Sequence, residues 1–76
     1  MKIKVGLLDT NDCTRKLAIL QEFDDGSYKA APFMIMTRAF SNNQYISYGQ
    51  PIKCKLQNVH YEEIELYTEA DNDNSG

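Results

Sequence analysis

Few side chains in this sequence are of the types that perform catalysis or hold a metal ion. The sequence contains one histidine, His60, and two cysteines, Cys13 and Cys54, at separate places in the chain. A structural zinc site takes about four ligands, so these residues do not complete one. No activated nucleophile and no glycine-rich phosphate loop accompanies them. We therefore expect a protein that is not an enzyme, with no catalytic residue, metal, cofactor or small-molecule substrate.

The basic and aromatic side chains indicate a different chemistry, the binding of single-stranded nucleic acid. Arginine and lysine neutralise phosphates, and each aromatic ring that stacks on a base contributes about 1–3 kcal/mol. In a small barrel, the candidate contact residues would occupy loops, the third strand and the start of a short helix. They are Arg15, Lys16, Lys29, Arg38, His60 and Tyr61. Since the chain has no tryptophan, we expect Phe33 and Phe40 to fill the core instead.

The carboxylates allow a second hypothesis, in which the partner is a protein. Glu62, Glu63 and Glu65 lie close together near the end of the chain. They can form a solvated sheet face, with Lys53 and Lys55 opposite Glu63 and Glu65 on a neighbouring strand. Alternatively, they can form an acidic surface that imitates nucleic-acid phosphate and fills the basic groove of a partner.

Alternation of polar and apolar residues predicts strands in the first half of the chain. Residues 2–8 alternate at period two, and a second apolar stretch covers residues 17–23, after a loop that contains Arg15 and Lys16. The sequence from Asp24 to Ser27 contains Asp-Gly, which is a strong hairpin signal. A third strand follows from Tyr28 to Met36, and Pro32 within it favours an edge position or a bulge.

The second half predicts one short helix and two more strands. Thr37 can cap a helix over residues 37–43. After Gly49 and Pro51, residues 52–56 and 63–67 alternate strictly, which places His60 in the loop between these strands. Five strands with a short helix between the third and fourth are typical of an all-β, OB-type barrel.

Length and charge limit the chain to one domain. The sequence has 76 residues and a mass of 8.7 kDa, and 42% of its residues are hydrophobic. Residues 1–68 are neutral, and the acidic residues 69–76 are expected to form a disordered tail. No apolar stretch is long enough for a secretory signal or a membrane span, so we expect a cytoplasmic protein. Both cysteines are expected to be free thiols, with Cys54 in the core.

The later strands carry a resemblance to a known family. The segment YGQPIKCKLQNVHYEEIELY resembles the closing half of S1-type RNA-binding domains, in which a glycine opens a strand of alternating apolar residues. Residues 17–56 are also similar to bacterial translation initiation factor one, with EFDDGS at its acidic-glycine hairpin. The resemblance covers residues 3–67 and implies an OB fold that binds RNA. The chain departs from the family in its neutral body and in a helix with Arg38 as its only basic residue.

Two functions follow as hypotheses. The first is a non-enzymatic OB-type module that contacts RNA or single-stranded nucleic acid. The second is a small inhibitor or adaptor of a host protein, of the kind encoded by phages and mobile elements, which binds through a sheet edge or its acidic side. The strand pattern favours the first hypothesis, and the neutral body favours the second.

Overall fold

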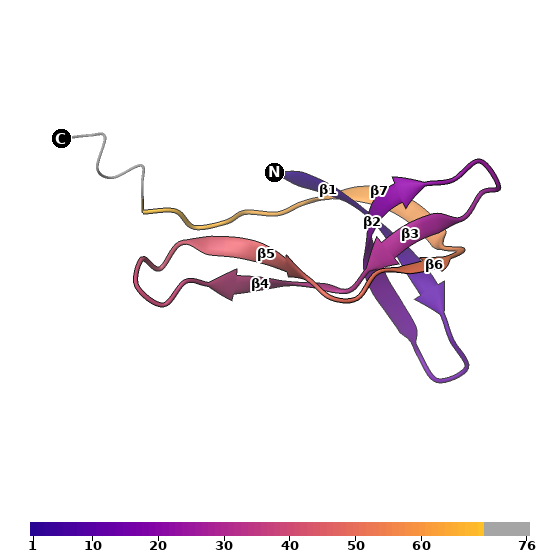
Figure 1. The fold of residues 1–76 in the computed structure, drawn as a ribbon, viewed down its shortest axis with the longest axis horizontal. Helices are drawn as coiled ribbons and strands as arrows, with labels where there is room; N and C mark the ends of the chain where they lie inside the picture. Colours follow the sequence, from indigo (N-terminus) through magenta and orange to yellow (C-terminus); the bar gives the residue numbers. More distant parts are fainter. Residues whose placement is uncertain (70–76) are drawn as a thin grey trace.

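The described part of the chain is built of strands. The structure, a computed structural model, describes residues 1–69, and these contain seven strands and no helix. They are β1 (Lys2–Asp9), β2 (Thr14–Glu22), β3 (Tyr28–Ala31), β4 (Phe33–Thr37), β5 (Gln44–Tyr48), β6 (Ile52–Cys54) and β7 (Gln57–Glu63). Five of them form an antiparallel sheet in the order β6-β3-β2-β1-β7, and β4 and β5 form a second sheet of two strands (Figure 1). The predicted all-β class is confirmed.

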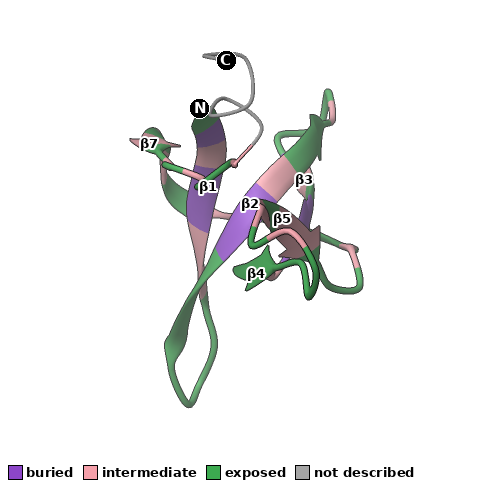
Figure 2. Cartoon of the chain, turned by 90° about the vertical axis from the view of Figure 1, so that its left-hand side faces the viewer, coloured by how far each residue is buried: buried purple, intermediate pink, exposed green. Residues whose placement is uncertain are grey.

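A small core occupies the inner part of β1 and β2 and the end of β3 (Figure 2). Val5 is the largest side chain that is fully buried, and the other buried apolar residues are Ile3, Leu17, Ala18, Ala30 and Ala31. Val5 lies opposite Ala18 on β2 and His60 on β7, so three strands meet at this residue. A short chain buries a limited fraction of its surface, and this core leaves many large apolar side chains outside.

Gly6 allows the chain between β6 and β7 to approach β1 closely. A Cβ atom at this position would lie 2.8 Å from Cβ of Leu56 and 3.3 Å from Cγ2 of Val59. The register of β1 against β7 shifts between Val5 and Leu7, at this glycine. The absence of a side chain therefore determines where β7 docks.

The predicted turn between β2 and β3 is confirmed. Gly26 has a φ of 87°, and the N–H of Phe23 donates to the carbonyl of Ser27 over 2.9 Å. Inside the turn, the backbone N–H and hydroxyl of Ser27 both donate to Oδ1 of Asp25. These bonds, with Lys53 nearby, lower the pKa of the Asp25 carboxyl to about 2.

The prediction of a closed OB-type barrel is wrong. β7 pairs with β1, whereas β6 pairs with β3, so β6 and β7 are the two edges of the sheet and do not face each other. Only Lys55 and Leu56 separate β6 from β7. A two-residue hairpin needs residues that accept positive φ, and neither lysine nor leucine does so readily. The predicted pairing of Lys53 and Lys55 with Glu63 and Glu65 is consequently absent.

The predicted helix over residues 37–43 is also wrong. These residues form the turn between β4 and β5, in which the N–H of Arg38 donates to the carbonyl of Asn43 over 2.8 Å. Asn42 has a φ of 59°, the left-handed conformation that asparagine tolerates better than most residues. One helical turn would gain little hydrogen bonding, while the hairpin pairs two whole strands.

Pro32 and Gly49 separate this hairpin from the main sheet. Pro32 has no N–H to extend the ladder of β3. Gly49 packs closely against Pro32, because a Cβ atom added at Gly49 would lie 3.1 Å from Cγ of Pro32. The N–H of Gly49 donates to the carbonyl of Pro32 over 2.8 Å. Beyond this pair the hairpin projects away from the five-stranded sheet (Figure 1). We call residues 33–48 the arm.

The chain that follows β7 runs along the arm. The last strand is Gln57–Glu63, so the predicted strand over residues 63–67 is wrong. Residues 65–69, here called the strap, lie beside β5 (Figure 1). The N–H of Gln44 donates to the carbonyl of Tyr67 over 2.8 Å, and Oε1 of Gln44 accepts the N–H of Tyr67 over 2.9 Å. Of the predicted disordered tail, residues 70–76 lie outside the described residues.

Candidate functional site

Two of the predicted nucleic-acid contacts lie in a strand rather than in a loop. Arg15 and Lys16 belong to β2, where Arg15 is exposed opposite Leu8 and Lys16 lies opposite Leu7. Their side chains alternate, so they point to opposite faces of the sheet. The sequence reasoning was wrong about the loop because the first apolar residue of the stretch, Leu17, is not where the strand begins.

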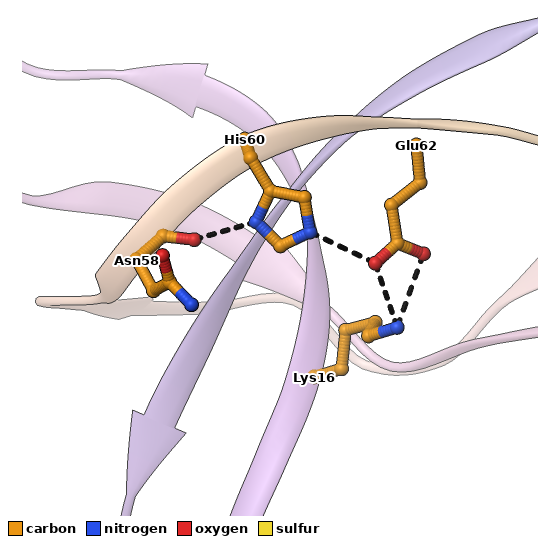
Figure 3. Close-up of polar contacts among 4 residues, drawn as sticks. All are labelled: Lys16, Asn58, His60 and Glu62. Carbon is orange, nitrogen blue, oxygen red and sulfur yellow. Dashed lines mark hydrogen bonds and ion pairs between the residues drawn. The ribbon is translucent and has the colours of Figure 1, made fainter.

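His60 joins Lys16 through Glu62 (Figure 3). Nε2 of His60 lies 2.8 Å from Oε2 of Glu62, and the same carboxylate oxygen lies 2.8 Å from Nζ of Lys16. Nδ1 of His60 lies 2.6 Å from the carbonyl oxygen of Asn58. This cluster connects β7 to β2 across β1. His60 therefore lies in a strand, and its predicted loop position is wrong.

Charge and hydrogen bonding shift the pKa values in this cluster. The Asn58 carbonyl and the Glu62 carboxylate both favour protonated imidazole, so the pKa of His60 is raised above 6.5. Lys16 and His60 together lower the pKa of Glu62. These groups satisfy one another at the surface, which indicates a structural role in holding β7 against the sheet. They leave no base directed at a cavity.

The other predicted contacts lie elsewhere. Tyr61 follows His60 in the strand and points to the opposite face, where Nζ of Lys4 lies 5.7 Å from its ring centroid. Lys29 lies on β3, opposite Lys53. Arg38 lies on the arm. The structure brings Lys16 and His60 together, but it does not gather the predicted residues on one surface.

The acidic residues near the end of the chain do not form a cohesive acidic face either. Glu62 is paired with Lys16 and His60. Glu63 lies 2.8 Å from the amino group of Met1. Because these carboxylates meet cations of the same chain, their field toward a partner's basic groove is reduced.

The arm is the feature that the sequence reasoning missed. It exposes several large apolar side chains, and Phe40, which was expected in the core, is fully exposed at its end. Met34 is 60% exposed, close to the 64% of Tyr61. The exposed apolar residues of the arm are Met34, Ile35, Met36, Phe40, Tyr45 and Tyr48.

Both faces of the arm carry these side chains. In β4 and β5, Met34 lies opposite Ser47 and Met36 opposite Tyr45, so these four side chains share one face. Ile35 belongs to the other face, opposite Ile46. The guanidinium of Arg38 lies 4.8 Å from the ring centroid of Tyr45.

A shallow open pocket marks the base of the arm. Its walls come from both strands and from the two residues that separate the arm from the main sheet. They are Pro32, Phe33, Met34, Ser47, Tyr48 and Gly49. The lining is mainly apolar, as in pockets that receive an apolar side chain of a partner.

Charge distribution separates the arm from the rest of the protein. Residues 33–48 include one charged residue, Arg38, although 25% of the whole chain is charged. This gap in the charge pattern was visible in the sequence and could have indicated an unusual surface. A stretch poor in charge is, however, also what a buried strand looks like, and the sequence alone does not separate the two.

Metal ligands and related proteins give no further indication of a site. Over residues 1–69 no group of three or more His, Cys, Asp or Glu side chains is placed to hold a metal ion. Cys13 and Cys54 are free thiols, and partial burial raises the pKa of Cys54. In the same range, no helix has the length and apolar character needed to cross a bilayer.

No protein-family model, curated protein or solved structure matches this chain.

Proposed function

We propose that the protein is a non-enzymatic binding module that docks another protein through the arm. The observation that carries this proposal is the group of exposed apolar side chains on a projecting hairpin with a single charge. Contiguous apolar surface beyond a few hundred Å² is uncommon on monomeric proteins and marks interaction sites.

The chemistry of the arm matches the centre of a protein interface. Tyrosine, phenylalanine, methionine and arginine are enriched in interface cores, whereas lysine and the acidic residues are depleted there. The arm offers Tyr45, Tyr48, Phe40, Met34 and Arg38 and has no lysine or carboxylate. The partner surface that fits it is apolar and carries little charge.

The arm is also supported well enough to act as a docking element. An isolated two-stranded hairpin is marginally stable in water. Here the strap adds hydrogen bonds from Tyr67 to Gln44, and the pair of Pro32 and Gly49 fixes the base. Preorganisation of this kind reduces the conformational entropy lost on binding.

An affinity-capture experiment tests the proposal with a matched pair of variants. The tagged full chain is incubated with lysate before and after nuclease treatment, and Met34→Ser is compared with Tyr61→Ser. Both positions are similarly exposed, but only Met34 lies on the arm. We expect nuclease-resistant partners that Met34→Ser loses and Tyr61→Ser retains. Equal capture by both variants, or loss of every partner after nuclease treatment, contradicts the proposal.

One observation favours nucleic acid as a second candidate ligand. Arg38 lies over the ring of Tyr45, and Tyr48 is exposed on the same hairpin. Single-stranded nucleic acid is bound by such combinations of cations and aromatic rings. The neutral charge of residues 1–68 and the scattered basic residues support this candidate less than a protein partner.

A further inference from the structure

We infer that the outer edge of β4 pairs antiparallel with β4 of a second copy of this chain. The pairing would join the two arms in a continuous sheet of the order β5-β4-β4′-β5′, centred on Ile35. This inference rests on the proposed function, because it names one partner of the arm. The faces of the joined sheet would remain available to another protein.

The backbone of β4 presents unused hydrogen-bonding groups on its outer edge. Pairs that bond and pairs that do not bond alternate along an antiparallel ladder. The N–H of Gly49 donates to the carbonyl of Pro32, and the N–H of Arg38 donates to the carbonyl of Asn43. These two bonded pairs, one at each end of β4, determine which pairs between them are bonded. The residues of β4 that direct their N–H and C=O groups away from β5 are therefore Phe33, Ile35 and Thr37.

The two edges of the arm differ. The strap lies on the outer edge of β5, where it accepts the N–H of Gln44. Over residues 1–69, no strand pairs with the outer edge of β4. The edge of β5 is thus bonded to the chain itself at Gln44, and the edge of β4 is open to a strand from outside.

Within its five residues, β4 also lacks the charge, proline and bulge that protect edge strands against pairing. Proteins protect such edges with short strands, charged side chains, proline or bulges. In the main sheet, the edge strand β6 is short and carries Lys53, and β7 carries Glu62 and Glu63. β4 has no charged residue, and its register against β5 has no shift.

The sequence of β4 suits pairing with itself. Around a two-fold axis at Ile35, Ile35 faces its own copy, Met34 faces Met36 and Phe33 faces Thr37, so no like charges meet. The two Arg38 residues would lie about 20 Å apart along the strands, at about 3.4 Å per residue. Salt screens charges at that separation. In this register the outward N–H and C=O groups of Phe33, Ile35 and Thr37 lie opposite the outward groups of Thr37, Ile35 and Phe33 of the other copy. A closed two-fold interface requires this match.

Mass measurement in solution tests the inference with three substitutions at one position. Analytical ultracentrifugation of the full chain at several hundred micromolar should give twice the mass of 8.7 kDa. Ile35→Pro removes the outward N–H without touching the bonds to β5, and Ile35→Lys places two lysines together at the axis. Ile35→Thr keeps the N–H and a β-branched side chain. We expect the proline and lysine variants to be monomeric and the threonine variant to remain a dimer.

Amide hydrogen exchange identifies the surface that pairs. In the wild-type dimer, the amides of Ile35 and Thr37 should become at least about tenfold more protected as concentration rises, while Met34 and Met36 stay protected at all concentrations. Protected Met34 and Met36 amides in Ile35→Pro would also show that the arm is still folded. A wild-type monomer, or a dimer whose Ile35 amide exchanges freely, overturns the inference. Neither result affects the proposed function, which fails if the capture of partners is independent of Met34 or if every partner is lost after nuclease treatment.

Discussion

The strap should set the local stability of the arm, and a truncation after Ile64 isolates its contribution. This end point keeps the pair of bonds between Met1 and Ile64 and removes the strap completely. The bonds lost include those that join Tyr67 to Gln44 and Glu69 to Asn42 and Asn43. A second truncation, which removes only residues 70–76, is the matched control.

The size of the effect follows from these bonds. At least four hydrogen bonds are lost, and because these four are near the surface we assign each about 0.5 kcal/mol, the low end of the usual range. The free energy of opening the arm should therefore fall by about 2 kcal/mol, which is roughly a 30-fold increase in exchange rate at 1.36 kcal/mol per decade.

Native-state hydrogen exchange measures this opening residue by residue. The amides of Met34 and Met36, which bond to β5, should exchange roughly 30-fold faster after removal of the strap. Amides of the main sheet, such as that of Ala18, should change by less than about 0.5 kcal/mol. After the control truncation, the opening free energies at Met34, Met36 and the main-sheet amides should all change by less than about 0.5 kcal/mol. Unchanged exchange at Met34 and Met36, or equal acceleration in the control, would refute the role of the strap.

Three further predictions concern the sheet and its charges. His60 has a raised pKa in the folded protein, so its stabilising contribution is complete below the ordinary value of 6.5 and is lost as pH rises through the folded pKa. Urea unfolding between about pH 6 and pH 8 should show stability falling with pH, and His60→Gln should remove that slope; an unchanged slope in the variant contradicts the assignment. Gly6→Ala places a Cβ against Leu56 and should cost about 1–3 kcal/mol in the same assay, whereas a change below about 0.5 kcal/mol would mean that β7 can shift. For single-stranded nucleic acid, the second candidate ligand, about three phosphate contacts would give a slope of roughly −2 for log affinity against log salt. Since Lys16 is paired with Glu62, Arg38→Ala should reduce the magnitude of that slope more than Lys16→Ala does. Undetectable binding near about 50 mM salt excludes this ligand.

Local patterns in the sequence were enough to predict the parts of the fold that local chemistry determines. Alternation located β1, and Asp-Gly located the turn before β3, because both depend on neighbouring residues. In both cases the physical cause lies within a few residues of the element. The single third strand predicted from Tyr28 to Met36 was wrong, because Pro32, expected at an edge position or a bulge, separates β3 from β4, and the two strands belong to different sheets.

The parts that were predicted wrongly depend on distant contacts. β7 covers residues 57–63, although residues 63–67 alternate better, because Gly6 on β1 leaves space for Val59 and Leu56. The arm was missed because Thr37 to Asn43 was interpreted as a capped helix, so the strand-forming residues of β5, with the sequence QYISY, were not assigned to a strand. The candidate contact residues were chosen for an OB barrel, and once β6 and β7 do not pair, Lys29 and Arg38 no longer share a surface with His60.

Site-specific photo-crosslinking in cells tests the central claim, that the arm is the docking surface. A photoreactive residue replaces Met36 on the arm in one version of the chain and Tyr61 on β7 in the other. Our account predicts covalent protein adducts from position 36, including one of twice the mass of 8.7 kDa, and few from position 61. Adducts that form equally from both positions, or from position 61 alone, would contradict it.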